Sequence, residues 1–575
     1  MTYAAPVAEQ RFLLRHIVKM EELTRHERFA QATAETVDAI LEGIAAFAEG
    51  EFAPLNRIGD RVGAKWSEQG VTMPDGFKAA YRAYVEGGWG SLAAPVEFGG
   101  QGLPLILATV VLEDLGSANM AFSLVAMLSA GAVEALPAHG SPELNSKWMP
   151  KLISGEWPAT MNLTEPQAGS DVGALKTSAE RQPDGSYRIR GQKIFITYGE
   201  HDLAENIVHL VLARTPDAPP GTRGISLFVV PKYLVGEDGS IGEPNDVRCV
   251  SIEHKMGIHA SPTCVMSYGD EGRCTGWLVG QENGGMRGMF TMMNNARLNV
   301  GLQGVSIAER ATQAAAAYAM ERVQGSREGR PARIVEHPDV RRMLLRMKAL
   351  TQAARALTYY AAGQTDRGCL GDADAKARAD LLTPLVKAYG TDVGVEVASL
   401  GVQVHGGMGF IEETGAAQHC RDARIAPIYE GTNGIQAADL VGRKLGLQGG
   451  ETVKRLIEEI RSDGGRPLEP LLDEIEDVIA WMNESERTVD DRMAGSYPLL
   501  TMMAVAVSAW LMKGQEDVAD QMQACGEGDP LFIGMKLAAC SYYRQCVVSE
   551  AIGLKAAARH GKESIYAVPA EAFSA

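Results

Sequence analysis

The chain has 575 residues, of which 46% are hydrophobic and 22% charged, and a formal charge of −17. This length exceeds a single hydrophobic core, so two to four domains are expected. A net negative surface repels nucleic acid backbones, which argues against nonspecific DNA or RNA binding. The eight cysteines include no CxxC pair, a usage typical of reduced thiols and not of a disulfide framework.

Residues 1–10 lack the basic stretch and apolar core of a signal peptide. Two long stretches carry no charge, Leu115–Val133 and Tyr497–Met512. A membrane span needs about 20 predominantly apolar residues. The first stretch, however, contains several serines, and the second contains Pro498. We therefore expect two buried core helices in a cytoplasmic protein with no membrane span.

Residues 1–155 are predicted to form an N-terminal helical domain. Apolar residues recur at three- and four-residue spacing over Phe12–Phe52, which is the period of a helix. Leu103–Leu136 is a long segment rich in alanine, leucine and valine, in which Gly116 and Gly131 are the expected interruptions.

Residues 156–280 are predicted to form a small β-domain. This part of the chain contains short runs rich in β-branched and aromatic residues, separated by turn sequences such as Pro183-Asp184-Gly185. The expected strands are Thr177–Ala179, Tyr187–Ile189, Lys193–Thr197, Ile207–Ala213 and Ile225–Val230. Short strands with such turns favour a β-barrel or sandwich.

Helical patterning returns over residues 281–447 and continues in a C-terminal helical extension, residues 448–575. The run Gln448-Gly449-Gly450 between them indicates a linker. A methionine stripe could form a soft pocket wall, although such a stripe is more often helix core. Its members are Met286, Met289, Met292 and Met293. The fold class is therefore mainly α with a central β-domain.

One carboxylate is notable in the run Tyr429-Glu430-Gly431-Thr432-Asn433, just before a predicted helix start. Thr432 suits an N-cap, because its hydroxyl can accept a hydrogen bond from an N–H of the first turn. Apolar residues then recur at helical spacing, at Ile435, Ala438, Val441 and Leu445. A glutamate held on a loop at a helix end suits a general base. Taken alone, the same residues also fit an exposed turn.

Three further motifs precede this run. They are Leu163-Thr164-Glu165-Pro166-Gln167-Ala168-Gly169-Ser170-Asp171, Gly191-Gln192-Lys193-Ile194-Phe195-Ile196-Thr197 and Gln403-Val404-His405-Gly406-Gly407-Met408-Gly409-Phe410. Each is weak alone, but the order and spacing of all four over residues 80–447 resemble the acyl-CoA dehydrogenase family of flavoproteins. The resemblance implies an N-terminal helical domain, a small β-barrel or sandwich domain and a C-terminal four-helix bundle, here followed by an extra helical domain.

The resemblance also implies FAD as the cofactor, and no metal site is predicted. The implied FAD-binding residues are Leu163, Thr164, Gly169, Ser170, Phe195, Thr197, Arg322, Gln403, Gly406, Gly407, Thr432 and Gly434. Small residues allow close backbone approach to a phosphate, and alternation along the second motif places Phe195 and Thr197 on one strand face. In the family, the third motif and the arginine matching Arg322 reach FAD across a subunit interface, which implies a homodimer or a higher homo-oligomer.

Three departures from the family pattern fall on FAD contacts. Asn162 precedes the first motif where the family usually has a smaller or apolar residue. Gln418 stands where a basic residue is usual. The run Arg322-Val323-Gln324-Gly325 is one residue shorter than its family counterpart and lacks the aromatic residue. There is also no GxGxxG between a strand and a helix, so FAD would bind without a Rossmann fold.

The implied reaction is α,β-dehydrogenation of an acyl-CoA thioester to the 2-enoyl-CoA. Glu430 would take the α-proton while the β-hydrogen leaves as hydride to flavin N5, and an electron-transfer flavoprotein would accept the electrons. Some relatives place the base on the helix that carries Arg297. Here Asn294-Asn295-Ala296-Arg297 contains no carboxylate, which favours Glu430. The implied substrate-binding residues are Ser170, Arg297, Tyr429 and Gly431.

The acyl group is assigned by resemblance. The run Thr2–Val7, the run Ile194–Asp202 and the C-terminal extension resemble a long-chain-length branch of the family. That branch includes enzymes acting on 3-methylmercaptopropionyl-CoA, an intermediate of dimethylsulfoniopropionate breakdown, and this thioester is the leading substrate. A straight-chain fatty acyl-CoA of medium or long length is the alternative.

Two other activities share the same motifs. An acyl-CoA oxidase would use O₂ in place of an electron-transfer flavoprotein, a difference in flavin solvation that sequence does not encode. A DNA-associated member of the fold should carry a basic C-terminal domain. The acidic residues of the extension are Glu458, Glu459, Asp473, Glu474, Glu476 and Asp477. No nucleic acid partner is therefore expected.

Overall fold

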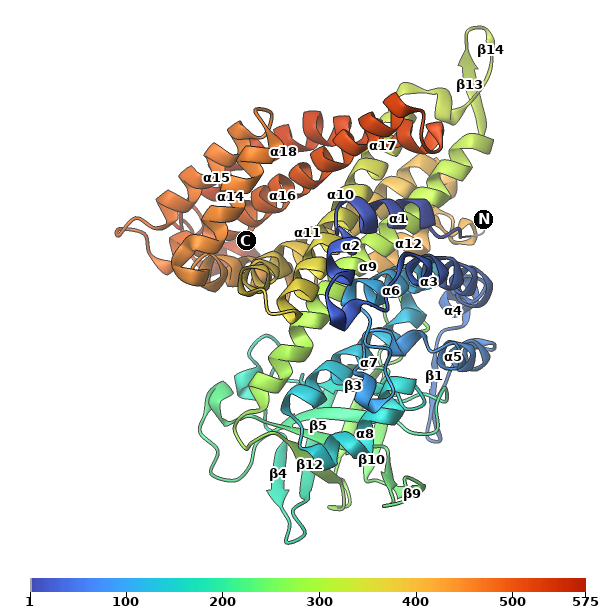
Figure 1. The fold of residues 1–575 in the computed structure, drawn as a ribbon. Coiled ribbons are helices and arrows are strands. Elements are labelled where there is room, and N and C mark those ends of the chain that lie inside the picture. The colour runs from blue at the N-terminus through green and yellow to red at the C-terminus, as the bar shows by residue number, and fades with distance from the viewer. Residues whose placement is uncertain (1–2) are drawn as a thin grey trace. The chain divides into compact units, whose positions relative to one another are not determined.

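The computed structural model describes residues 3–575, and its contacts divide the chain into two compact units. We call them the β-unit, residues 3–5 and Gln31–Asn299, and the helical unit, Pro6–Ala30 and Val300–Ala575. Figure 1 labels many of the elements of both units. Thr2, the first residue of the run that resembles the long-chain-length branch, lies outside the described residues.

The helices of the β-unit precede its sheet. They are α3 (Ala34–Phe47), α4 (Leu55–Val62), α5 (Phe77–Glu86), α6 (Leu105–Ala118), α7 (Met120–His139) and α8 (Pro142–Ser154). The predicted Leu103–Leu136 helix is broken at Asn119, because its backbone is extended and its side chain caps α7 by accepting from the Phe122 N–H at 3.1 Å. The predicted interruptions were wrong, since Gly116 and Gly131 lie inside the two helices.

An eight-stranded sheet forms most of the remaining β-unit. Its strands are β3 (Ala159–Asn162), β4 (Ser178–Arg181), β5 (Tyr187–Thr197), β6 (Val208–Ala213), β7 (Ser226–Pro231), β10 (Val247–Ile252), β11 (Thr263–Tyr268) and β12 (Thr275–Val279). They pair in the order β10-β11-β5-β12-β7-β6-β3, with β4 on β5, and only β3 and β6 run parallel. Two predicted strands are parts of β5, and β3, β10, β11 and β12 were not predicted.

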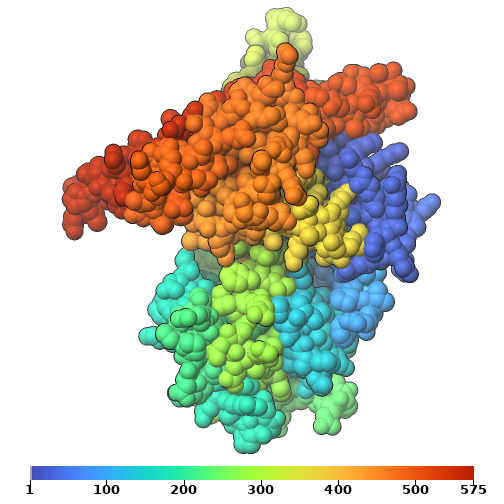
Figure 2. All heavy atoms as spheres, turned by 60° about the vertical axis from the view of Figure 1, so that its left-hand side comes forward, coloured from blue at the N-terminus to red at the C-terminus, as the bar shows by residue number. Residues whose placement is uncertain are grey.

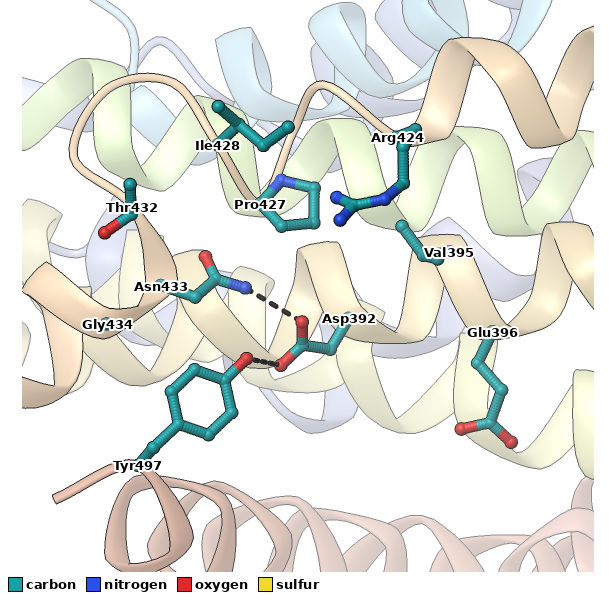
Figure 3. Close-up of a pocket in the computed structure, with 10 residues that line it drawn as sticks. All are labelled: Asp392, Val395, Glu396, Arg424, Pro427, Ile428, Thr432, Asn433, Gly434 and Tyr497. Carbon is teal, nitrogen blue, oxygen red and sulfur yellow. Dashed lines mark hydrogen bonds between the residues drawn. The ribbon is translucent and has the colours of Figure 1, made fainter. Parts of the chain in front are cut away.

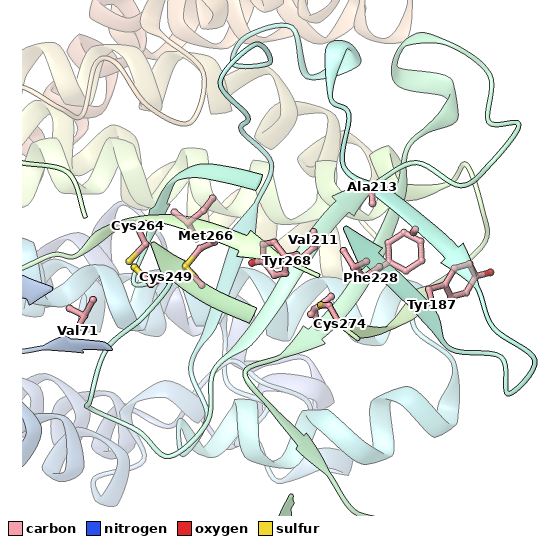
Figure 4. Close-up of a cluster of buried hydrophobic side chains, with 14 residues drawn as sticks. Val71, Tyr187, Val211, Ala213, Phe228, Cys249, Cys264, Met266, Tyr268 and Cys274 are labelled. Carbon is pink, nitrogen blue, oxygen red and sulfur yellow. The ribbon is translucent and has the colours of Figure 1, made fainter. Parts of the chain in front are cut away.

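Two short hairpins complete the strands of this unit. They are β1 (Lys65–Ser67) with β2 (Gly70–Thr72), and β8 (Tyr233–Val235) with β9 (Ile241–Pro244). The sheet core is apolar and rich in sulfur, with Cys249 and Cys264 near Met266 in Figure 4. Because apolar burial raises the pKa of the Cys264 thiol, this side chain is an inert core residue at neutral pH.

The helical unit is built on three long helices. These are α9 (Gly285–Glu321), whose first turns belong to the β-unit, α10 (Pro338–Cys369) and α11 (Ala373–His405). The crossing of α9 and α11 is close, because a Cβ on Gly304 would lie 1.9 Å from the carbonyl oxygen of Gly390. Only glycine allows this approach, and it fixes α11, which supports the predicted catalytic loop.

A hairpin interrupts the helical pattern predicted for residues 281–447. It consists of β13 (Val323–Arg327) and β14 (Arg330–Arg333) and projects from the helical unit in Figures 1 and 2. Glu328 and Gly329, which join the two strands, adopt φ values of 52° and 77°, as in the type I′ turn of a β-hairpin. The shorter helices α12 (Ala416–Ala423) and α13 (Asn433–Asp439) follow α11.

The C-terminal extension is helical, as predicted. It contains α14 (Glu451–Gly464), α15 (Glu469–Met482), α16 (Val489–Cys525), α17 (Pro530–Tyr542), α18 (Val548–Ile552) and α19 (Lys555–Ala558). Figure 2 shows these residues, orange to red, as one continuous surface. Within the helical unit, α16 packs against α10, α11 and α13.

The N-terminal segment of the helical unit is tied to the extension. The segment Phe12–Phe52, predicted to be helical, contains most of α1 (Val7–His16), together with α2 (Met20–Thr24) and α3. On α17, the fully buried Lys536 Nζ donates to both carboxylate oxygens of Glu9 on α1, at 2.5 and 2.6 Å. A buried charge of this kind must be paired, so α1 and α17 are fixed together.

Two described helices, α7 and α16, are long and apolar enough to cross a membrane by length and composition alone. In the protein, 83% and 78% of their apolar windows are buried. Such burial is typical of core helices, the role that the sequence predicted for both segments.

Candidate active site

The predicted site residues are divided between the two units. The β-unit carries Leu163, Thr164, Gly169, Ser170, Phe195, Thr197 and Arg297. The helical unit carries Arg322, Gln403, Gly406, Gly407, Tyr429, Glu430, Gly431, Thr432 and Gly434. Each unit therefore positions its own set by its own contacts.

A buried ion pair fastens the first motif to the second in the β-unit. Lys193 Nζ donates to Glu165 Oε1 at 2.8 Å, and the two side chains are 0% and 4% exposed. Lys193 Nζ also donates to the Leu163 carbonyl at 3.0 Å, and the Ile194 N–H donates to the Thr164 carbonyl at 2.9 Å. Leu163 and Thr164 are thus held against β5.

The Glu165 carboxylate accepts several further hydrogen bonds. Thr177 donates through its N–H at 3.0 Å and its hydroxyl at 2.6 Å, and the Lys176 N–H donates at 2.7 Å. Burial alone would raise the pKa of Glu165, but the charge of Lys193 and these donors lower it to about 2. Burial lowers the pKa of Lys193 to about 8, so both groups are charged at neutral pH.

This ion pair was not predicted from the sequence, although its two residues lie in the first and second motifs. A signal was present: Lys193 precedes the apolar residues of a strand, and Glu165 follows a leucine and a threonine. Charged residues in apolar surroundings are usually paired when they are buried. Their separation of 28 residues gave no reason to pair these two.

A β-bulge lies in β5 at the second motif. Against β11, Cys264 pairs with Ile196 and Met266 with Lys193. Two residues of β5 therefore face one residue of β11, and the strict alternation predicted for this strand is broken. Phe195 has a φ of 60° at the bulge and is 58% exposed. Bulges next to active sites commonly redirect a side chain in this way.

Three predicted cofactor-binding glycines border open space. A Cβ built on Gly169, Gly406 or Gly407 would meet no atom of the described chain within 4 Å. Packing within the chain therefore does not require glycine there, although the φ of 60° at Gly406 itself favours glycine. The open space leaves room for a bound group to approach the backbone, which is the close contact that a cofactor phosphate needs.

Two of the three residues or runs that depart from the family pattern, Asn162 and Gln418, form hydrogen bonds within the chain. The buried Asn162 donates to Thr160 Oγ1 at 2.8 Å and accepts from the Tyr268 hydroxyl at 2.7 Å. The buried Gln418 donates to Asp422 Oδ2 at 3.2 Å. These contacts give both residues a structural role.

The remaining predicted residues outside the loop differ in burial. Arg297 is buried on α9. Arg322 is exposed, and its carbonyl accepts from the Ile334 N–H at 2.8 Å, which closes the base of the hairpin. The methionine stripe is core in part, since Met289 and Met292 are fully buried.

The third motif ends α11 and leaves apolar side chains on the surface. Gln403, Gly406 and Gly407 are exposed. Beside them, Met408, Phe410 and Ile411 are 46%, 84% and 45% exposed. A group of exposed apolar side chains is typical of an interaction surface.

Glu430 lies on a strained turn of the helical unit. Its φ is 54°, and that of Gly431 is 81°. Few residues other than glycine adopt this left-handed conformation, and it persists where the surrounding structure enforces it. The predicted helix start is confirmed, because Thr432 Oγ1 accepts from the Ile435 N–H at 3.2 Å.

The predicted apolar face of this helix is not its buried face. Ile435 is 42% exposed. The buried residues of α13 are Asn433, Gln436, Ala437 and Asp439. The polar members of this set indicate that α13 is held by hydrogen bonds as well as by apolar packing.

The loop around Glu430 is held on both sides. The Tyr429 hydroxyl donates to Gln303 Oε1 on α9. The Asn433 N–H donates to the Pro427 carbonyl at 3.0 Å. Burial, together with the neighbouring Glu430 carboxylate, raises the pKa of Tyr429, so this phenol stays protonated as a donor.

A cavity of about 510 Å³ lies beside the loop within the helical unit (Figure 3). Its lining residues are Asp392, Val395, Glu396, Arg424, Pro427, Ile428, Thr432, Asn433, Gly434 and Tyr497. A cavity of this size can hold a ligand of small-molecule dimensions. Two of the predicted cofactor-binding residues, Thr432 and Gly434, are in its wall.

Four family models match successive parts of the chain. They are described as the acyl-CoA dehydrogenase N-terminal domain over residues 34–156, the middle domain over 160–270 and the C-terminal domain over 283–445. The fourth, acetyl-CoA dehydrogenase C-terminal like, matches residues 451–569. The extension is thus a recognised domain in its own right.

Individual proteins match over nearly the whole chain. The 3-methylmercaptopropionyl-CoA dehydrogenase of Ruegeria pomeroyi is 45% identical, over 96% of this chain and 97% of its own. A butyryl-CoA dehydrogenase of Syntrophomonas wolfei is 36% identical, over 94% of both chains. A crystal structure of an acyl-CoA dehydrogenase complexed with FAD from Bacillus anthracis shares the fold, with a TM-score of 0.74 at 23% identity over 94% of this chain and 90% of its own.

Proposed function

This chain belongs to the acyl-CoA dehydrogenase family, and from that premise we propose that Glu430 is the base that removes the α-proton of the substrate. The enzyme is an oxidoreductase that acts on a CH–CH bond of an acyl-CoA, and its cofactor is FAD.

The observation that carries the proposal is the left-handed backbone of Glu430. A glutamate gains nothing from this conformation, which costs about 1–2 kcal/mol. The neighbouring contacts maintain it, through the N-cap of Thr432 and the hydrogen bond from Asn433 to Pro427. Asp217 and Glu328 share a positive φ on other turns, so the strain supports the proposal together with the place of Glu430 in the fourth motif.

Glu430 would act on a C–H bond that is a very weak acid. Proton removal requires the carboxylate to lie within hydrogen-bond reach of the α-carbon and the thioester carbonyl to be polarised by donors as charge develops. Because the turn is fixed, the carboxylate is already held in place and does not depend on the movement of a flexible loop. Tyr429 and Gly431, on either side, are the residues proposed to border the substrate.

The residues proposed to hold FAD fit such a group in both units. Gly169, Gly406 and Gly407 leave open space at the backbone, and the exposed Phe195 ring offers a flat apolar contact. The remaining members of the proposed set are Leu163, Thr164, Ser170, Thr197, Arg322, Gln403, Thr432 and Gly434. When bound, FAD supplies the acceptor for the β-hydride.

A homo-oligomer and an electron-transfer flavoprotein are the proposed protein partners. The exposed apolar residues Met408, Phe410 and Ile411 at the third motif support a subunit interface there. An electron-transfer flavoprotein is proposed as the electron acceptor because the enzyme is assigned as a dehydrogenase. Oxygen consumption during turnover would instead indicate an oxidase.

The proposed substrate is 3-methylmercaptopropionyl-CoA, which would yield methylthioacryloyl-CoA. Identity of 45% over nearly the whole chain to a dehydrogenase named for this substrate supports the assignment. The 36% identity to a butyryl-CoA dehydrogenase favours a straight-chain acyl-CoA as the second candidate. Values of kcat/KM for 3-methylmercaptopropionyl-, butyryl- and octanoyl-CoA decide between them, and a higher value for either straight-chain thioester would overturn the first assignment.

The test of the base is Glu430→Gln in the FAD-loaded enzyme. The variant should retain FAD and lose substrate-dependent bleaching of the flavin by about 10²–10⁴-fold, the contribution of a general base. Glu413→Gln is the control, because Glu413 is an exposed glutamate in the short 3₁₀ helix Glu412–Thr414 of the helical unit. Rapid bleaching by Glu430→Gln would show that another group takes the proton.

A further inference from the structure

The geometry points to Tyr497, a residue of the C-terminal extension, as a positioning residue for the catalytic loop. Its hydroxyl fixes Asp392 on α11, and Asp392 in turn fixes Asn433, which closes the loop that carries Glu430. This inference rests on the proposed role of Glu430 as the base. It gives the extension a part in catalysis beyond its packing on the bundle.

Two hydrogen bonds to Asp392 form the link. The Tyr497 hydroxyl on α16 donates to Asp392 Oδ2 at 2.6 Å, and Asn433 Nδ2 donates to Asp392 Oδ1 at 2.9 Å. Figure 3 shows the carboxylate between the phenol and the amide at the cavity wall. Each oxygen has its own donor, so the plane of the carboxylate is set from both sides.

The side chain of Asn433 is held in one orientation. Its Oδ1 accepts from the fully buried Lys387 Nζ at 2.9 Å, and its Nδ2 also donates to Thr391 Oγ1 at 3.0 Å. With Asp392, these partners occupy both ends of a buried amide. Such a network gives a unique geometry when every member is satisfied.

Asn433 transmits this geometry to the loop. Its N–H donates to the Pro427 carbonyl at 3.0 Å, so the five residues between them form a closed loop with Glu430 at its centre. Asn433 is also the first residue of α13. A shift of Asn433 therefore moves the closing bond of the strained turn, and small displacements of a reacting group are costly in rate.

Removal of the Tyr497 hydroxyl would loosen Asp392 from one side. Its Oδ2 would face the cavity, where water can replace the fixed donor without defining an orientation. The extension itself would stay in place, because other contacts hold it to the bundle. Arg378 donates to Glu459 at 2.7 Å, and Arg346 donates to Glu550 at 2.7 Å.

A second tyrosine of the extension provides a matched control. The Tyr543 hydroxyl bonds the Tyr389 hydroxyl on α11 at 2.6 Å, and both residues are buried. Among the described residues, Tyr389 and Tyr543 make no hydrogen bond to the loop between Pro427 and Asn433. Tyr543→Phe thus removes the same group from the same interface between α11 and the extension.

The experiment compares Tyr497→Phe and Tyr543→Phe in the full-length, FAD-loaded enzyme. Flavin bleaching is followed with 3-methylmercaptopropionyl-CoA, or with butyryl-CoA if only that thioester bleaches the wild type. Tyr497→Phe should lower the limiting rate about tenfold, within the range for a misplaced group, with KM changed less than about twofold. Tyr543→Phe should lower Tm at least as much, because it leaves the buried Tyr389 hydroxyl without this partner, and leave the rate within about twofold of wild type.

A double-mutant cycle tests the route through Asp392. If Tyr497 acts through this carboxylate, Tyr497→Phe combined with Asp392→Asn should be no slower than Asp392→Asn alone. The inference is overturned if the two effects multiply, if Tyr497→Phe matches the wild-type rate, or if Tyr543→Phe is equally slow. If no acyl-CoA bleaches the flavin of the wild-type enzyme, the proposed function is overturned instead.

Discussion

The two glutamates Glu165 and Glu430 are held in different ways. Glu165 is buried in the β-unit, where a lysine and several hydrogen-bond donors surround its carboxylate. Glu430 is only half-buried in the helical unit, and its backbone is strained. A carboxylate whose two oxygens both accept hydrogen bonds within the protein stabilises the fold. A carboxylate held on a fixed turn suits proton transfer. We therefore expect that substitutions around Glu165 lower the stability of the fold and that substitutions around Glu430 lower the reaction rate.

Removal of the Glu165 partner should have the largest effect on stability. Lys193→Met leaves a buried carboxylate without its counter-charge, which costs about 3–5 kcal/mol. Lys151→Met is the control, since the Lys151–Glu156 pair is 41% and 49% exposed and such pairs contribute about 0–1 kcal/mol. The measurement is the free energy of unfolding in urea. Equal losses from both variants would contradict a structural role for Glu165.

Acid should weaken the same region. The pKa of Glu165 is about 2 in the folded protein against an ordinary value of 4.5. A lowered pKa stabilises the fold above pH 4.5, and this contribution is lost as the pH falls toward 2. The shift corresponds to about 3 kcal/mol. The free energy of unfolding of Glu165→Gln should therefore depend less steeply on pH below 4.5 than that of the wild type, and parallel curves would refute the shift.

Local signals predicted much of the fold, because they arise within a few residues. The N-cap at Thr432 needs only a hydroxyl before a helical pattern, and the structure contains it. The same kind of signal failed where a single side chain decided the outcome. Asn119 breaks the long N-terminal helix, although two nearby glycines were the stronger breakers by composition.

Contacts between distant residues could not be predicted from a single sequence. The bulge that exposes Phe195 depends on the register of β5 against β11, and no local pattern encodes that register. The bond between Tyr497 and Asp392 spans 105 residues. The identity of Glu430 as the candidate base came from motif order, whereas its strained backbone is visible only in the structure.

Gly431→Ala should lower the stability of the fold less than Lys193→Met does, and should lower the reaction rate more. Gly431→Ala introduces a side chain at a φ of 81°, which costs about 1–2 kcal/mol. A shift that relieves this strain would move the adjoining residue Glu430. The limiting rate of flavin bleaching should therefore fall by about tenfold or more, as expected for a misplaced reacting group.

The control for this change is Gly371→Ala, between α10 and α11. Gly371 has a φ of 97°, and a Cβ there would meet no atom of the described chain within 4 Å. The backbone strain is of the same kind, so the loss in Tm should be comparable, but no predicted site residue adjoins it. If both variants bleach at the wild-type rate, the conformation of the turn does not position Glu430. If only Gly431→Ala lowers the limiting rate of flavin bleaching, the strained turn helps to set the rate. The buried ion pair of the β-unit would then contribute to stability instead.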